Sequence, residues 1–542
     1  MIRVAKDKLV ILGYILTFWG ALPGTLVILA VWGERVLGPR LRWPGLVPAG
    51  LALAGVSGVM LAVAIVQFTR ATGHLPISAF PPRRLVRSGV FGIWRHPIYL
   101  FFLMSFGGLT AVFWPAGSTL VAVPVLALAT FVYARFEERG LERRFGSLYR
   151  GHRRQTSIAV PRLIHVVRLL FAALGRLLFQ LEVRGRDHCR LDPPFIVVSA
   201  HRSFLDPFFI LAALGSPVHF ITTSGMFRKP LSRFLFSKLL GLPVTRYKPD
   251  VRNALEVRRR LREGCVVGIF PEAERSWTDS MAGFKPEALK LLWSLSDIPI
   301  LPARLQGTYA VWPRWARRPR RAKVSVRFEK PLFASGTGSP PGLEARLSGL
   351  IAPRQPPVGR QSPIPAAGIE SVMYRCPDCL CFDAVRSGKG AHFNCSSCRA
   401  DFTLLSGFTV RGSDGSVRSS LASLSRLIRI ASDSGLSAGG LPFAPARVKA
   451  SVEKNGRLEA VGPGRLGISD HQLTFESAGP AVRIHFGDIR AVVIEGARKL
   501  EVYGGRPARL YQFTVIGQSA LKWQDLISEA VRRHGGASPP TT

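Results

Sequence analysis

The residues best suited to chemistry lie in two short polar stretches in the middle of the chain. The first, His201-Arg-Ser-Phe-Leu-Asp206, pairs an imidazole with a carboxylate, and the second, Phe270-Pro-Glu-Ala-Glu-Arg-Ser276, sets two carboxylates beside an arginine. An imidazole oriented by a carboxylate can take a proton from a hydroxyl group, and an arginine fork can hold an anion such as phosphate. Together these groups predict acyl transfer to a phosphorylated acceptor.

Apolar runs precede both stretches and predict the elements that position them. Residues 195–199 run before the first stretch and residues 265–269 before the second, so each polar stretch follows a buried strand. Ligands of α/β folds bind at the carboxyl ends of such strands. The sequence therefore predicts an α/β domain with its site at this edge.

The spacing of His201 and Asp206 predicts a turn between them. Five residues of helix rotate by about 500°, which would leave the two side chains roughly 140° apart on a regular helix. Asp206 precedes Pro207 and the apolar stretch 208–214, a pattern typical of a helix N-cap followed by proline at the first helical position. One carboxylate oxygen can then accept from the helix amides while the other orients the imidazole.

Residues 163–335 resemble the glycerolipid acyltransferase superfamily of the lysophosphatidic acid (1-acylglycerol-3-phosphate) type. The resemblance rests on the two stretches above and on other family blocks in the same order, which are Gly225-Met-Phe-Arg-Lys-Pro230, Leu240-Gly-Leu-Pro-Val-Thr-Arg246 and Ile298-Pro-Ile-Leu-Pro302. It implies acyl-CoA or acyl-carrier protein as the donor and a lysophospholipid as the acceptor.

The same resemblance assigns roles to individual residues. It implies that His201 is the general base with Asp206 holding its imidazole, and that no covalent acyl-enzyme is required. The residues implied to bind or order the acceptor are Arg246, Glu272, Arg275 and Ser276. Neither Ser203 nor Ser276 has the glycine setting of a nucleophile elbow.

Two residues of the second stretch depart from the family. Ala273 stands where the family has glycine, and Glu274 stands where threonine is common. If position 273 needs a positive φ, alanine adds strain of about 1 kcal/mol. The identity of the acceptor is what these departures leave open.

The charge and the long apolar segments favour a membrane protein. The 542 residues include 73 Lys and Arg against 34 Asp and Glu, a formal net charge of +39, which suits nucleic acid or an anionic membrane. Long apolar segments favour the membrane, and no nucleic-acid partner is expected. The expected spans are residues 10–32, 45–68, 99–114 and 117–133. Because the segment from 69 to 98 and the segment after 133 are basic, we expect a bacterial inner-membrane protein whose acyltransferase and later modules are cytoplasmic.

The N-terminal 162 residues contain a second candidate site. Arg95-His-Pro-Ile-Tyr99 and the pair Glu137-Glu138 lie at those ends of the last two spans that meet at one membrane face. Residues 80–162 resemble the isoprenylcysteine carboxyl methyltransferase and phospholipid methyltransferase family. The resemblance implies that Arg95, His96, Tyr99, Glu137 and Glu138 bind S-adenosylmethionine. The alternative is a membrane anchor with ordinary interfacial charge.

Beyond the acyltransferase region, Gly, Pro and Ser are frequent around one short helical segment, residues 342–351, which predicts a linker over residues 336–367. Residues 368–410 then contain two Cys-x2-Cys pairs with fifteen residues between them, the spacing of a structural zinc ribbon. The predicted ligands are Cys376, Cys379, Cys395 and Cys398, with Cys381 and His392 as competitors. Zinc ribbons also occur in DNA-binding proteins, but few basic residues support that alternative here.

Residues 440–536 alternate apolar and polar side chains between Gly and Asp turns and end in an amphipathic helix from 520 to 534. This pattern resembles a pleckstrin-homology-like domain of the GRAM type. The predicted fold is thus multidomain, with an α-helical membrane domain, an α/β acyltransferase domain, a zinc ribbon and a small, mostly-β PH-like domain. Two alternative functions are an acyltransferase for another lysolipid or aminolipid, and a membrane scaffold whose enzyme domains are relics.

Overall fold

The computed structural model describes residues 12–13, 16–38, 46–76, 84–189, 191–245, 250–354, 362–388, 390–433, 445–454, 457–469 and 471–534. The chain forms two compact units. One comprises residues 1–166 with 262–265, and the other comprises residues 167–261 and 266–542.

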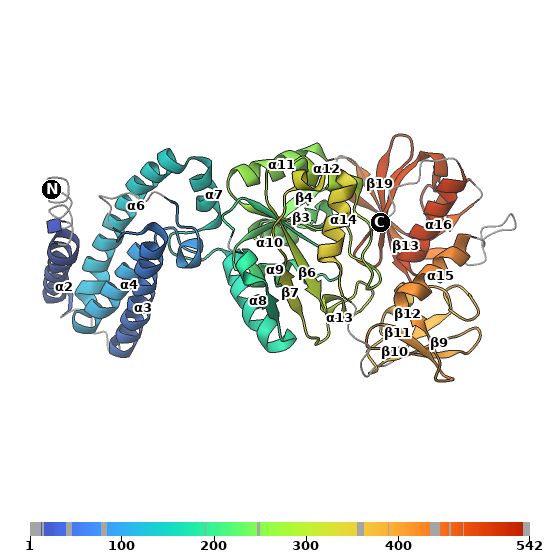
Figure 1. Cartoon of the computed structure of the whole chain (residues 1–542), viewed down its shortest axis with the longest axis horizontal. Coiled ribbons are helices and arrows are strands. Elements are labelled where there is room, and N and C mark those ends of the chain that lie inside the picture. The colour runs from blue at the N-terminus through green and yellow to red at the C-terminus, as the bar shows by residue number, and fades with distance from the viewer. Residues whose placement is uncertain are drawn as a thin grey trace. The chain divides into compact units, whose positions relative to one another are not determined.

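Helices make up the N-terminal unit (Figure 1). They are η1 (Leu16–Ala21), α2 (Leu22–Leu37), α3 (Leu46–Thr72), η3 (Gly89–Gly92), α4 (Pro97–Phe113), α5 (Pro115–Gly117), η4 (Ser118–Ala122), α6 (Val123–Phe145) and α7 (Ser147–Gln155). Helices α3 and α4 pack closely because glycine occupies their contact. A Cβ atom on Gly108 would lie 2.8 Å from the carbonyl oxygen of Gly50, a distance that no larger residue allows.

Two helical runs in the described part of this unit, Val47–Thr72 and Pro115–Phe145, are long and apolar enough to cross a bilayer. They correspond to the predicted spans 45–68 and 117–133, although the second continues to Phe145. The predicted span 99–114 is the shorter apolar helix α4. Residues 115–117, where we expected the connection between the last two spans, are already helical, so the bend lies at Trp114. The predicted span 10–32 begins outside the described residues, and its described part forms η1 and α2.

The second unit begins with a seven-stranded sheet in the order β1-β7-β6-β2-β5-β3-β4. The strands are β1 (Glu182–Arg184), β2 (Phe195–Ser199), β3 (Val218–Thr223), β4 (Leu242–Val244), β5 (Val266–Ile269), β6 (Ile300–Gln306) and β7 (Ser325–Phe328). Strands β6, β2, β5, β3 and β4 are mutually parallel, and β7 runs against β6. Strands β2 and β5, both fully buried, are the two predicted from the apolar runs.

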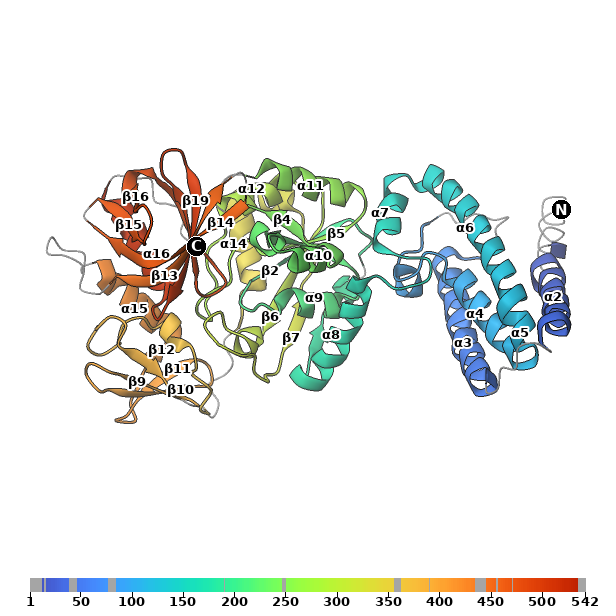
Figure 2. The ribbon, with the colours of Figure 1, turned by 180° about the vertical axis from the view of Figure 1, so that it is seen from behind.

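Helices cover both faces of this sheet. Helices α11 (Val251–Arg262), α12 (Pro286–Trp293) and α14 (Pro340–Ile351) lie on one side in Figures 1 and 2, and α8 (Leu163–Phe179) and α9 (Asp206–Leu214) lie on the other. On that other side the rings of Phe171 and Phe208 stack with centroids 4.6 Å apart. Two further helices, α10 (Pro230–Lys238) and α13 (Thr308–Val311), follow β3 and β6.

Helix α14 corrects one predicted boundary. Residues 336–367 were expected to form a linker, but Leu343, Leu347 and Ile351 of α14 are fully buried in the core against β2, β5 and β6. Their spacing of four residues places the three side chains on one face of the helix. The α/β domain therefore extends to Ile351.

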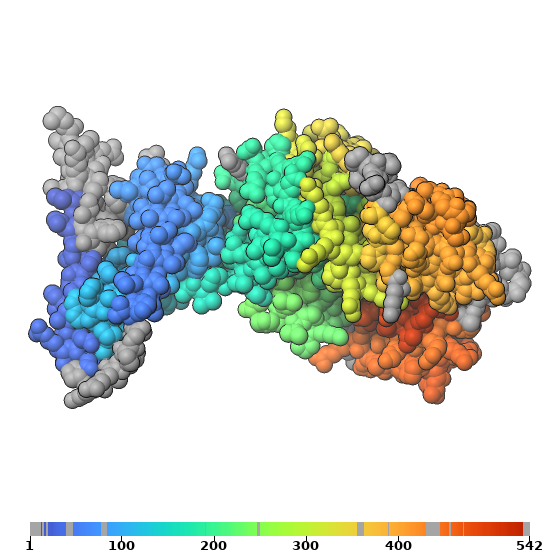
Figure 3. Space-filling view, turned by 90° about the horizontal axis from the view of Figure 1, so that it is seen from below, coloured from blue at the N-terminus to red at the C-terminus, as the bar shows by residue number. Residues whose placement is uncertain are grey.

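Two β modules complete the second unit, and Figure 3 shows them, in orange and red, in direct contact. The first is a five-stranded antiparallel sheet in the order β12-β11-β10-β9-β8, followed by helix α15 (Leu421–Asp433). Its strands are β8 (Val385–Ser387), β9 (His392–Cys395), β10 (Asp401–Leu405), β11 (Thr409–Gly412) and β12 (Val417–Ser420). This module, called the cysteine module below, continues past the predicted end at residue 410.

The second β module, called the C-terminal sheet below, has seven antiparallel strands in the order β16-β15-β14-β13-β19-β18-β17 and ends in helix α16 (Ala520–Arg533). Its strands are β13 (Ala446–Lys454), β14 (Arg457–Ile468), β15 (Gln472–Glu476), β16 (Val482–His485), β17 (Ile489–Glu495), β18 (Lys499–Gly504) and β19 (Arg509–Ile516). One hydrophobic core joins both β modules to Trp277, Tyr309 and Trp315 of the α/β domain.

Candidate active site

His201 and Asp206 meet at the carboxyl ends of β2 and β5, as the sequence predicted. The Nδ1 atom of His201 lies 3.0 Å from Oδ2 of Asp206, which is fully buried. Because an ionised carboxylate only accepts, Nδ1 donates and Nε2 keeps its lone pair. The His201 side chain is 20% exposed, so this base is reachable from outside.

The expected capping role of Asp206 is wrong in one respect. Leu205 occupies the N-cap of α9, and Asp206 is the first helical residue. The same Oδ2 atom accepts from His201 and from the backbone amides of Arg202 and Ser203, each at 2.7 Å. The carboxylate thus accepts from amides of the turn before the helix and not from amides of the helix itself. It orients the imidazole by its direct hydrogen bond to Nδ1.

Glu272 joins the two polar stretches. One of its oxygens accepts from the backbone amide of His201 and the other from that of Ala282, both at 2.8 Å. The residue is 2% exposed, so both oxygens are committed to backbone donors. Burial raises the pKa of Glu272 to about 7, and the two amide donors oppose that rise.

The other residues expected to bind the acceptor do not form one group in the described part of the chain. Arg275 is half-buried, with its guanidinium carbon 5.9 Å from the centre of the Phe204 ring. The amide of Ser276 donates to the carbonyl oxygen of His201 at 2.9 Å, and its hydroxyl donates to the carbonyl of Ser280. Ser276 therefore holds the loop. Arg246 lies outside the described residues.

Burial and charge set the basicity of His201. Its ring stacks on Phe270 with centroids 4.2 Å apart. Burial lowers the pKa of His201 below its ordinary value of 6.5, the Asp206 carboxylate opposes that change, and the positive charge of Arg275 adds to it. The imidazole is consequently neutral at pH 7 and able to accept a proton.

The two departures from the family block have distinct structures. Ala273 has φ +60°, the left-handed conformation that glycine adopts without strain. Glu274 is buried and accepts at 2.9 Å from Arg314, a residue that sequence reasoning did not select. The sequence around Arg314, Trp312-Pro-Arg-Trp315, is only a weak signal that this arginine is buried. Basic residues follow it to position 321, and together they resemble a run of solvated charges.

The five residues expected to bind S-adenosylmethionine come together in the N-terminal unit. Arg95 donates to Glu138 at 2.8 Å, and the Tyr99 hydroxyl donates to Glu137 at 3.0 Å. His96 lies between the two carboxylates, 3.4 Å from Glu137 and 3.5 Å from Glu138. The Glu138 side chain is 4% exposed and that of Glu137 is 32% exposed, so Glu137 is the carboxylate that a ligand can reach.

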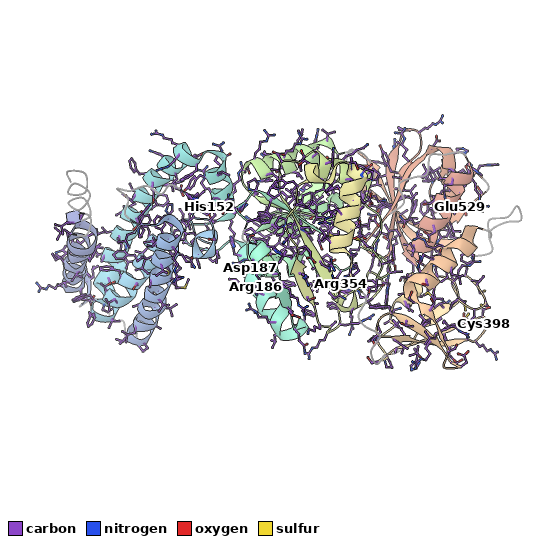
Figure 4. The ribbon with its side chains drawn as sticks, in the orientation of Figure 1. His152, Arg186, Asp187, Arg354, Cys398 and Glu529 are labelled. Atoms are coloured by element: carbon purple, nitrogen blue, oxygen red, sulfur yellow. The ribbon has the colours of Figure 1, made fainter. Side chains whose placement is uncertain are left out.

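The four predicted cysteine ligands also come together. Their sulfur atoms all lie within 4.8 Å of one another, with Cys376 to Cys398 and Cys379 to Cys395 each at 3.7 Å. Four thiolates around a tetrahedral zinc ion with Zn–S bonds of about 2.3 Å would be about 3.8 Å apart, so the group fits a metal. Figure 4 labels Cys398 on the cysteine module. The competitors Cys381 and His392 are exposed and stand outside the group.

Two regions of the chain match known protein families. Residues 180–306 match the family described as Acyltransferase, and residues 47–147 match the family described as Phospholipid methyltransferase. Apolar helices within the second of these regions, residues 47–147, and the nature of the two families point to association with a membrane.

Individual relatives match the acyltransferase region. The chain is 28% identical over 178 residues to 1-acyl-sn-glycerol-3-phosphate acyltransferase BAT2, chloroplastic, of Brassica napus, covering 32% of this chain and 51% of that protein. It is 31% identical over 123 residues to a probable 1-acyl-sn-glycerol-3-phosphate acyltransferase of Mycoplasma genitalium, covering 21% and 45%. It is 30% identical over 144 residues to lysophospholipid acyltransferase LPCAT4 of Mus musculus, covering 26% of each protein.

This chain thus spans about half the length of the first two relatives, 51% and 45%, and a smaller part of the third, 26%. The chain therefore combines a region similar to the Phospholipid methyltransferase family, residues 47–147, with a region similar to the Acyltransferase family, residues 180–306.

Proposed function

We propose that this protein is a membrane-bound acyltransferase that moves a fatty acyl group from acyl-CoA or acyl-carrier protein to the hydroxyl of a lysophosphatidic acid-like acceptor. The observation that supports this most directly is the His201–Asp206 pair, with Arg275 on the facing loop, at the carboxyl ends of adjacent parallel strands. The relatives that match this region are acyltransferases for lysophospholipids.

In the proposed reaction, Nε2 of His201 takes the proton of the acceptor hydroxyl while its oxygen attacks the carbonyl carbon of the acyl thioester. The C–S bond then breaks, and the thiolate leaves as the thiol after taking the proton from the His201 imidazolium. Asp206 holds the ring in the tautomer that leaves Nε2 free to accept, and it stabilises the imidazolium that forms. Arg275, with Arg246, binds the acceptor phosphate.

The surroundings of Ser203 argue against a serine nucleophile. Ser203 is fully buried, and its hydroxyl oxygen accepts from the amide of Leu205 at 3.3 Å. A nucleophile needs an exposed oxygen within hydrogen-bond distance of a base. This arrangement supports a direct attack by the acceptor, without an acyl-serine.

The acceptor is a lipid, so the domain must meet a bilayer. Helix α8 exposes Leu169, Leu170 and Leu177 at 53%, 50% and 78%, and it also contains Arg168 and Arg176. An apolar face with arginines at its border is typical of a helix that lies in the interface of an anionic membrane. We propose that α8 rests on the cytoplasmic surface of a bacterial inner membrane, which a topology map of position 201 would test.

A specific observation favours methyl transfer as a second activity, since all five residues implied by the family resemblance form one cluster. S-adenosylmethionine would supply the methyl group when bound. Glu137, the exposed carboxylate of the cluster, would accept from its ammonium or hydroxyl groups, while Arg95 and Glu138 hold each other at 2.8 Å. His96 would keep Glu137 in place.

For acyl transfer, we expect His201→Ala to lower kcat by about 10²-fold or more, the usual contribution of a positioned base. Ser203→Ala is the matched control from the same turn, and its kcat should stay within about threefold because its hydroxyl faces the backbone. The assay measures labelled acyl-CoA with a panel of lysophospholipids. Equal activity of His201→Ala and unmodified protein would contradict the mechanism. An acyl group trapped on Ser203 would show a serine nucleophile instead.

For the pH dependence, we expect kcat/KM to fall in two steps as the pH is lowered. Glu272, with a pKa of about 7, protonates first and weakens its bonds to the two amides, and His201 protonates below its ordinary value of 6.5 and ceases to be a base. Glu272→Gln should remove the upper step and leave the lower one. A single step above pH 7 in both proteins would be the contrary result.

For the methyltransferase-like cluster, we expect the purified protein to bind S-adenosylmethionine in calorimetry. Glu137→Ala or His96→Ala should weaken that binding by about tenfold or more, since each removes a group from the cluster. Glu142→Ala, which removes an acid farther along α6, serves as the control. The absence of binding to unmodified protein at millimolar cofactor would leave this domain an anchor.

For the cysteine module, we expect one tightly bound zinc ion per chain in metal analysis of the full-length protein. Replacing Cys376 and Cys398 together by serine should release it, because two thiolates cannot hold zinc in a closed tetrahedral site. Replacing Cys381 by serine should leave the metal content unchanged. Full occupancy after loss of Cys376 and Cys398 is the outcome that disproves this assignment.

A further inference from the structure

Glu274 lies inside the catalytic stretch, yet its partner connects that stretch to the C-terminal sheet. The Nη1 atom of Arg314 donates to Oε2 of Glu274 at 2.9 Å and to the carbonyl oxygen of Arg275 at 3.0 Å. The same guanidinium donates through Nε to Gly496 at 2.6 Å and through Nη2 to Ile494 at 2.7 Å. We call this set of four hydrogen bonds the Arg314 bridge.

Both charged side chains of the Arg314 bridge are buried. Arg314 is 5% exposed and Glu274 is 6% exposed, and the guanidinium lies over the ring of Trp277, 4.5 Å from its centre. A buried charge is retained only when it is paired and hydrogen-bonded, and here carbonyl oxygens of β17 and of the turn after it complete the pairing. Removing one member leaves the other charge buried without its partner.

A second ion pair joins the same sheet to another loop of the acyltransferase. Arg228, which follows β3, donates to Glu501 of β18 at 2.7 Å and lies 3.5 Å from Glu495 of β17. Gln512 donates to both carboxylates, at 2.8 and 2.9 Å, and so holds them in place for Arg228. Strands β17 and β18 therefore contact two separate loops of the acyltransferase.

The Arg314 bridge reaches the catalytic base through one further bond. It fixes the Glu274 side chain and the Arg275 carbonyl, and the next residue, Ser276, donates its amide to the carbonyl of His201 at 2.9 Å. The loop that presents Arg275 is thus held on one side by His201 and on the other by the C-terminal sheet. Glu274 stands where the resembled family commonly has threonine, which has no carboxylate to pair with Arg314.

We propose that Glu274 and Arg314 are positioning residues for acyl transfer, through which the C-terminal sheet sets the loop that presents Arg275 to the acceptor phosphate. This inference rests on the proposed acyltransferase function and adds a role for the C-terminal sheet. In the full chain, loss of the bridge weakens binding of the phosphorylated acceptor more than it slows the chemical step.

The test compares Glu274→Thr, Glu274→Gln and Glu370→Gln in full-length protein. Glu274→Thr removes the ion pair, and Glu274→Gln keeps an oxygen that can accept from Arg314. Glu370→Gln is the matched control, because Arg317 and Glu370 also join the acyltransferase to the cysteine module, at 2.7 Å, but with 58% and 31% of the side chains exposed. An exposed pair contributes little and does not contact the catalytic loop.

We expect Glu274→Thr to raise the KM for lysophosphatidic acid about tenfold with kcat changed less than threefold, Glu274→Gln to show a smaller rise, and Glu370→Gln none. Hydrogen exchange, which needs no activity, should accelerate in residues 272–277 of Glu274→Thr and not in the control. An unchanged KM together with unchanged exchange would overturn the proposal. If unmodified protein has no acyltransferase activity but exchange accelerates as expected, the positioning contact stands and the proposed function fails instead.

Discussion

The second unit depends on one buried carboxylate. Oδ2 of Asp206 accepts from two consecutive backbone amides and from the His201 ring, so the turn between β2 and α9 has one conformation and the imidazole one orientation. Those amides would otherwise be buried without acceptors, which costs about as much as the lost hydrogen bonds. The helix start, the turn and the base are therefore fixed by the same atom, and Glu272 extends this order to the facing loop through the His201 amide.

The parts of the site that were predictable from the sequence have local causes. An apolar run followed by a polar stretch predicts a buried strand and its carboxyl end, and β2 and β5 formed there with Val198 opposite Ile269. The positive φ anticipated at Ala273 is present for a similar reason, because glycine at that place in the resembled block marks a turn. The cysteine ligands came together because short Cys-x2-Cys spacings limit where their sulfur atoms can go.

What could not be predicted depends on contacts between distant segments. Glu274 pairs with a residue 40 positions away, and that residue bonds to carbonyl oxygens 182 and 180 positions away, so no local pattern reveals the Arg314 bridge. Composition also misled at α14, where a helical segment was predicted but Gly, Pro and Ser assigned it to a linker, while Leu343, Leu347 and Ile351 enter the core. The periodic apolar positions were the better signal.

The hydrophobic core shared by Trp277, the cysteine module and the C-terminal sheet has an evolutionary consequence. Modules with separate cores can be exchanged between genes independently, because each folds without its neighbours. Here the apolar faces of three modules are completed by one another, so a recombination event that replaced one of them would expose the cores of the others. The segment from the acyltransferase to α16 must therefore be inherited as a single piece, and substitutions on either side of the shared core must be selected together.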